Sequence, residues 1–222
     1  MNRFRKLALV GEGVSVLSLI AFTIACGSSS SQVRVFDVYP NVSNVDMLIN
    51  NKTIASGVAY GTASAYASAS SGSQNLIVEA SGSTSPLINQ TISLGSGSST
   101  ILATGSGAVA IADNNSAPGS GNIKIRVINA SPTLGTADVY VVTSGTSISG
   151  LSPTFSNLNY QSASSYQSLA AGSYQVIFTQ PGQQFPELST SSLSFSAGQV
   201  RTAVALDAQG GGFTTAILSD LN

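Results

Sequence analysis

Charged residues, histidine, tryptophan and cysteine are scarce or missing in this chain. Charged side chains make up 8% of its 222 residues, and the sequence has no His, no Trp and a single Cys. The missing histidine removes the commonest general base and the commonest metal ligand, and one cysteine cannot form an internal disulfide. We therefore expect no serine–histidine catalytic site, no metal site and no bound cofactor.

The chain also has little charge of either sign to attract a charged partner. Its formal net charge is −1, and after residue 25 five basic residues face eight acidic ones. A nucleic-acid-binding surface needs clustered Lys and Arg to neutralise phosphates, so this composition excludes nucleic acid as a partner. Ser, Thr, Asn, Gln and Gly take the place of charge, so hydroxyls and amides must solvate the surface.

Residues 1–25 have the order of a bacterial signal peptide. A basic start is followed by an apolar run at residues 14–24, then by the small Ala25 and by the only cysteine, Cys26. A helix needs about 20 apolar residues to span a bilayer, so a permanent transmembrane anchor is the weaker interpretation.

The residues around Cys26 resemble a bacterial lipoprotein signal, in which a short box of apolar or small residues precedes a lipidated cysteine. The resemblance implies that Cys26 carries lipid and becomes the new amino terminus, followed by a flexible tether at residues 26–32. We therefore expect an extracytoplasmic protein of the bacterial cell envelope, with the membrane as a partner through its lipid anchor. Ordinary secretion with a free thiol is the alternative.

The rest of the chain matches itself at an offset that grows from 92 to 107 residues. Eight residues of this growth fall near residues 143–153, and insertions collect in surface loops, so the second copy could have diverged in function there. The matched pairs include Arg34 and Arg126, Asp46 and Asp138, Tyr60 and Tyr160, Tyr66 and Tyr166, and Asp113 and Asp220.

Short runs rich in Val, Ile, Thr and Tyr alternate with Gly, Ser, Asn and Pro in both copies, which is typical of antiparallel strands. Residues 33–39 and 123–129 predict strands. Residues 100–112 and 202–219 predict hairpins that turn through glycines. About seven or eight strands in each copy predict an all-β fold.

We expect two tandem antiparallel β-sandwich modules of the immunoglobulin-like type after the signal peptide, at residues 33–113 and 122–222. Residues 114–121, rich in Asn, Ser, Pro and Gly, predict the linker between them. A small closed barrel for each copy is the structural alternative.

Residues 125–142, IRVINASPTLGTADVYVV, resemble a family of domains of unknown function found in bacterial exported and surface proteins. The family's pattern is an Arg-Val-x-Asn-Ala-Ser-Pro strand and turn, an Asp-Val-Tyr-Val strand and a closing strand that ends in Asp. The resemblance covers both copies and implies an extracytoplasmic all-β domain without a known activity. In the first copy, Asp37 stands where the second has Asn129.

Few residues stand out as candidate site residues. Asn129 and Ser131 could edge a ligand pocket, but these residue types ordinarily bond their own backbone and shape a turn. Asp46 and Asp138 recur at the start of a strand, where a carboxylate usually accepts hydrogen bonds from loop amides. Oxygens of residues 113–116 could bind calcium, yet no complete calcium loop follows.

The leading hypothesis is a non-catalytic cell-envelope lipoprotein that presents its two modules for binding, adhesion or scaffolding to an envelope or extracellular protein or glycan. One alternative is a carboxylate-only extracytoplasmic hydrolase such as a glycosidase. Another is a self-associating surface-layer component, because few lysines guard its strand edges. The hydrolase would have to draw its acid and base from Asp37, Asp46, Glu79, Asp138, Glu187 and Asp207.

Overall fold

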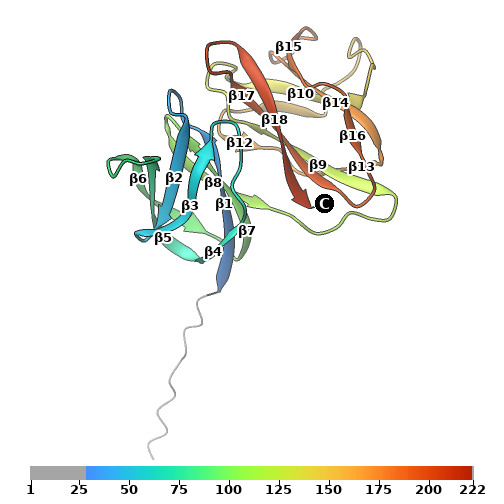
Figure 1. Ribbon diagram of the computed structural model, residues 1–222. Coiled ribbons are helices and arrows are strands. Elements are labelled where there is room, and N and C mark those ends of the chain that lie inside the picture. The colour runs from blue at the N-terminus through green and yellow to red at the C-terminus, as the bar shows by residue number, and fades with distance from the viewer. Residues whose placement is uncertain (1–28, 222) are drawn as a thin grey trace, which may run out of the picture.

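A computed structural model describes residues 29–221, and these residues form strands without a helix (Figure 1). The expected signal peptide and Cys26 lie outside them, and the described part of the chain contains no helix that could span a membrane. The strands are β1 (Ser30–Val38), β2 (Asn44–Ile49), β3 (Lys52–Ala59), β4 (Ala67–Ser70), β5 (Gly72–Ala80), β6 (Pro86–Leu94), β7 (Gly97–Thr104), β8 (Gly107–Asp113), β9 (Asn122–Asn129), β10 (Ala137–Thr143), β11 (Phe155–Leu158), β12 (Ser162–Ala163), β13 (Gln167–Ala170), β14 (Gly172–Thr179), β15 (Pro186–Ser189), β16 (Leu193–Phe195), β17 (Val200–Asp207) and β18 (Phe213–Leu221).

The first half of the chain, from β1 to β8, forms two sheets around one core. Their strand orders are β4-β1-β7-β8 and β3-β2-β5-β6. Alternate residues of each strand point into the core, as the burial pattern of β2 shows. The core contains Val33, Val35, Val45, Met47, Leu76, Val78, Ile101 and Ala103.

The second half, from β9 to β18, repeats these pairings. One sheet has the order β12-β9-β17-β18, with β13 also on β9, and the other has the order β11-β10-β14-β15, with β16 also on β14. The predicted all-β sandwich is confirmed, and none of the four sheets closes on itself. The second core contains Ile123, Ile125, Val127, Val139, Val176, Phe178, Ala203 and Ala205.

Two strand pairs differ from the antiparallel pattern expected from the sequence. β1 runs parallel to β7, and β9 runs parallel to β17. A parallel pair needs a long connection, and here the whole second sheet of each half lies between the partners. Alternating hydrophobicity fixes which face of a strand is buried but not the direction of its neighbour, so the sequence carried no signal for this pairing.

The two halves lie side by side (Figure 1), and a cluster of buried residues joins the sheet that contains β1 to the sheet that contains β9. Valine side chains on one face of β1 enter the core of the first half, whereas Phe36 and Val38 on its other face are buried against the second half. This third cluster also contains Leu102, Ile128, Ala130, Val204, Leu206 and Leu218. The halves therefore share a hydrophobic interface.

Candidate functional site

A buried arginine of the first half pairs with the end of the second half. The Arg34 side chain is 4% exposed, and its Nη2 forms an ion pair with Asp220. Its Nη1 donates to the Ser219 carbonyl at 3.0 Å, and its Nε donates to Thr100 Oγ1 at 2.9 Å. The guanidinium also lies 4.7 Å from the centre of the Tyr66 ring. The buried charge thus meets acceptors from both halves.

A buried arginine of the second half pairs in the same way with the end of the first half. The Arg126 side chain is 2% exposed, and its Nη2 pairs with Asp113 at the end of β8. Its Nη1 donates to the Ala112 carbonyl at 2.7 Å, and its Nε donates to Thr202 Oγ1 at 2.8 Å. The guanidinium lies 4.8 Å from the centre of the Tyr166 ring.

Two threonine hydroxyls join both pairs into a closed hydrogen-bonded ring. Thr100 donates to Asp113 at 2.8 Å, and Thr202 donates to Asp220 at 2.6 Å. Tyr66 and Tyr166 donate to the same two carboxylates, and burial raises the pKa of both tyrosine hydroxyls. Every charged group of the ring is engaged within the protein. The ring consists of Arg34, Thr100, Asp113, Arg126, Thr202 and Asp220.

The oxygens considered for calcium already hold a cation of the protein itself. The Lys124 ammonium donates to the carbonyl of Asn114 at 3.2 Å, to its side-chain oxygen at 3.1 Å and to Ser116 Oγ at 3.0 Å. The Asp113 carboxylate meanwhile accepts hydrogen bonds from Thr100 and Arg126 within the ring. Among residues 29–221, no three His, Cys, Asp or Glu side chains gather in a metal-binding group.

Asn129 and Ser131 lie in a buried turn rather than at a pocket. The Asn129 side-chain oxygen accepts from the Ser131 amide at 3.2 Å, and its Nδ2 donates to the carbonyls of Gly135 and Leu158 at 2.6 and 3.1 Å. Ser131 Oγ donates to Asp207 and accepts from the Leu134 amide. Both side chains therefore hold the loop after β9.

Asp37 occupies the position that matches Asn129, but it cannot make the same bonds. Its Oδ1 accepts from the Tyr39 amide at 2.9 Å, as the Asn129 oxygen accepts from Ser131. Its Oδ2 is buried without a hydrogen-bond partner among the described residues. Burial raises the pKa of the Asp37 carboxyl to about 6, although the Tyr39 amide opposes the rise.

The carboxylates proposed for hydrolysis do not face one another across a pocket. Asp46 and Glu79 lie opposite each other on β2 and β5, so they project from one side of the same sheet. Asp46 accepts from the Gly57 amide at 2.7 Å and from Ser81 Oγ at 2.6 Å. Five surface pockets in residues 29–221 are each lined by at most one carboxylate, Asp207 in one and Asp138 in another.

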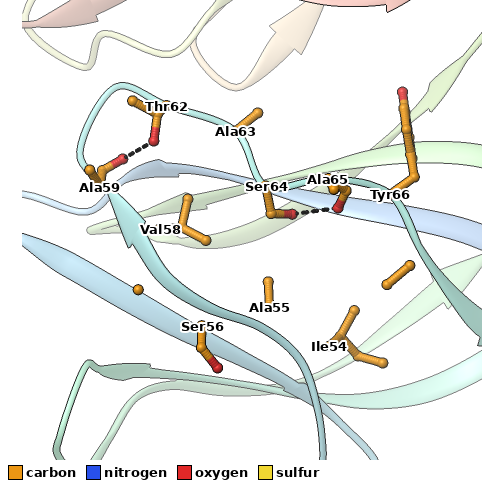
Figure 2. Close-up of a pocket in the computed structure, with 12 residues that line it drawn as sticks. Ile54, Ala55, Ser56, Val58, Ala59, Thr62, Ala63, Ser64, Ala65 and Tyr66 are labelled. Carbon is orange, nitrogen blue, oxygen red and sulfur yellow. Dashed lines mark hydrogen bonds between the residues drawn. The ribbon is translucent and has the colours of Figure 1, made fainter.

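One of these pockets is a groove at the open edge of the first half (Figure 2). It has a volume of about 480 Å³ and lies between β3 and the segment that leads into β4. Small residues such as Ala55, Ser56 and Ala65 line it. Tyr66 is its only aromatic residue, and the Arg34 guanidinium already lies against that ring.

The two halves differ in side-chain size at one position of this groove. Ala55 matches Phe155, which packs against the second core. The second half thus has a ring packed on its core at the position where the first half has the small Ala55 of the groove.

A different pocket lies on the outer face of the second half, and we call it the loop pocket. Its floor is β10, and its walls are the β10–β11 connection and the turn before β15. It has a volume of about 610 Å³. The matching connection between β2 and β3 has only two residues, so the longer one lies where the shift in offset predicts it. Asp138, Tyr140, Ser149, Leu151, Ser152, Pro153, Gly182, Gln184 and Phe185 line the pocket.

Two side chains hold the walls of the loop pocket in place. Gln184 accepts from the Gly150 amide at 3.0 Å and donates to the Leu151 carbonyl at 2.8 Å. Asp138 accepts from the amides of Asn157 and Gly182, both at 2.8 Å. Asp138 therefore links β11 to the turn before β15, with both carboxylate oxygens engaged.

The loop pocket gathers the exposed large hydrophobic residues of the described chain. Leu151 is 41% exposed and Phe185 is 77% exposed, and both line this pocket. Exposed apolar residues that cluster in one place mark interaction sites more often than scattered ones do. Nothing in the sequence marks Phe185, because no periodicity or motif distinguishes an exposed aromatic residue from a buried one.

The fold and the pocket together define an all-β sandwich protein with a surface pocket on one inserted loop. Residues 31–140 match the family described as Domain of unknown function (DUF4397). The matched segment runs from β1 to β10, so it includes the Asp-Val-Tyr strand but not the loop pocket's walls. A search of curated proteins found no match. That the remainder of the second half is another copy stays a prediction.

Several solved structures are distantly similar to the chain. The C-terminal domain of AlgF from P. aeruginosa is 10% identical, with a TM-score of 0.30, over 46% of this chain and 99% of that one. The family 26 carbohydrate-binding module from Eubacterium rectale Amy13K is 12% identical, with a TM-score of 0.27, over 87% and 98%. A putative cell adhesion protein from Bacteroides fragilis is 8% identical, with a TM-score of 0.23, over 85% and 97%. At these values none defines a function for this chain.

Proposed function

We propose that this chain is a non-catalytic binding protein of the bacterial cell envelope, anchored through lipid on Cys26, and that the loop pocket is its binding surface. The order of residues 1–26 supports the anchor. The structural use of the candidate carboxylates supports a binding role over a hydrolytic one. Asp46 and Asp138 accept from backbone amides, and Asp207 accepts from the hydroxyls of Ser131 and Thr133.

The observation that carries this proposal is the exposure of Leu151 and Phe185 in one pocket. Most other large apolar side chains of the described chain are buried or partly buried, so leaving these two in water costs free energy that a bound partner would recover. Gln184 and Asp138 hold the pocket walls before any ligand arrives, which lowers the entropic cost of binding.

Phe185→Ala is expected to weaken binding to the producing organism's envelope at least about tenfold, because truncating an anchor residue removes its whole contact area. The test is co-sedimentation of the chain from Ser29 onward, which holds every described strand, with washed envelopes. The free energy of unfolding should stay within about 0.5 kcal/mol of wild type, since the ring is 77% exposed.

Gln183→Ala is the matched control, since Gln183 is exposed in the same turn but does not line the pocket. It should bind as the wild type does. Equal binding by all three proteins, or no binding by any, would contradict the proposed role of the loop pocket.

A further inference from the structure

We infer that the loop pocket takes a neutral oligosaccharide, with one sugar ring stacked on Phe185 and its hydroxyl groups bonded to the pocket's free hydroxyls. The inference rests on the proposed function and specifies the ligand class for the same pocket. It follows from the charge, the polar groups and the strand arrangement of the lining.

The lining offers no free charge to a ligand. Asp138 is its only charged residue, and each of its carboxylate oxygens accepts a backbone amide at 2.8 Å. An anionic ligand would find no cation there, and a cationic ligand would compete with the two amides for the carboxylate. The pocket therefore favours a ligand without charge.

The polar groups that remain free are hydroxyls. The side chains of Tyr140, Ser149 and Ser152 line the pocket, and none of them makes a hydrogen bond to another described residue. A hydroxyl both donates and accepts, which matches the double capacity of the hydroxyls on a sugar. Tyr140 stands where the first half has Leu48, so the first half has no hydroxyl at this position.

The exposed ring supplies the apolar contact. A sugar ring has an apolar face of C–H groups, and the flat face of an aromatic ring packs against such a surface while leaving the sugar's hydroxyls at the edge for hydrogen bonds. Phe185 is 77% exposed beside Leu151 and Pro153, so its ring is accessible to such a ligand.

An extended polypeptide fits this pocket less well. Peptides that bind to sheets usually add a strand to a free edge. The floor of the loop pocket is β10, which has β11 on one side and β14 on the other, so its backbone is already paired. The free edges of this sheet are β11, β15 and β16, and none of their residues lines the pocket.

The test has two arms. In the first, isothermal titration measures binding of neutral gluco-, galacto- and manno-oligosaccharides, and of uronic-acid oligosaccharides of equal length, to the chain from Ser29 onward. At least one neutral oligosaccharide should bind, Phe185→Ala should weaken that binding at least about tenfold, and the charged counterpart should bind no more tightly.

Tyr140→Phe removes the hydroxyl but keeps the ring that packs against Ile148 and Ile177, so it should weaken binding about twofold to tenfold without changing stability. Unchanged affinity in Tyr140→Phe, or tighter binding of the uronic-acid series, would count against the inference.

In the second arm, envelopes are treated with periodate, which cleaves sugars, or with protease before co-sedimentation. The inference predicts that periodate abolishes the Phe185-dependent binding and that protease leaves it intact. Binding that depends on Phe185 but survives periodate and is lost to protease would overturn the inference and leave the proposed function standing. Binding that never depends on Phe185 would overturn both.

Discussion

Asp220→Asn is expected to lower the free energy of unfolding by about 3–5 kcal/mol, the range found when one partner of a buried ion pair is removed. The change keeps the shape of the side chain but leaves the Arg34 guanidinium, 4% exposed, without its counter-ion. It also turns an acceptor into a donor that faces further donors, because Thr202 and Tyr166 both donate to this carboxylate. Urea unfolding at pH 7 measures the loss.

Two variants calibrate this result. Asp113→Asn breaks the matching pair with Arg126 and should cost a similar amount. Glu187→Gln removes the same charge from an exposed position and should change stability by less than about 0.5 kcal/mol. If Asp220→Asn proved as mild as Glu187→Gln, the ring would not hold the halves together.

Asp37→Asn is expected to stabilise the protein above pH 6, by up to about 3 kcal/mol. Burial raises the pKa of this carboxyl from 3.8 to about 6, so folding disfavours its charged form. Below pH 3.8 the carboxyl is neutral in both the folded and unfolded chain and costs nothing. As the pH rises from 3.8 to about 6, stability falls by about 1.4 kcal/mol for each pH unit, and above pH 6 the loss is complete. Asparagine abolishes that loss.

The second half supplies the structural reason and the reverse control. At the matching position, Asn129 donates its amide to the carbonyls of Gly135 and Leu158, and a carboxylate such as that of Asp37 cannot donate either bond. Asn129→Asp should therefore destabilise the protein above pH 6. Unfolding curves at pH 4, 6 and 8 test both variants. A pH dependence in Asp37→Asn equal to that of the wild type would show that Asp37 is not its source.

The repeat in the sequence marked the residues of the ring without revealing their contacts. Arg34 matches Arg126 and Asp113 matches Asp220, so self-comparison identified all four as equivalent positions. Equivalence suggests that each arginine bonds within its own copy, whereas each one pairs with the other half. Self-comparison aligns positions along the chain, and it carries no information on how two units face each other.

The loop pocket was only half predictable. The eight additional residues gave the location of a longer connection, because insertions collect in surface loops. Phe185 lies in a separate turn that matches the first half without any length change, and its exposure depends on how that turn meets the inserted loop through Gln184. Alternation and turn signals describe one strand or one turn at a time, so they cannot predict a contact between two loops.

Hydrogen exchange, with and without saturating envelope material, tests the binding surface most directly. If the loop pocket is the binding surface, envelope material should slow exchange in residues 143–154 and 180–188 of the wild type. It should cause no such change in Phe185→Ala. The groove of the first half, at residues 52–70, should exchange equally in both conditions. Protection at residues 52–70 without protection at the loop pocket would contradict the account and assign binding to the open edge between β3 and β4.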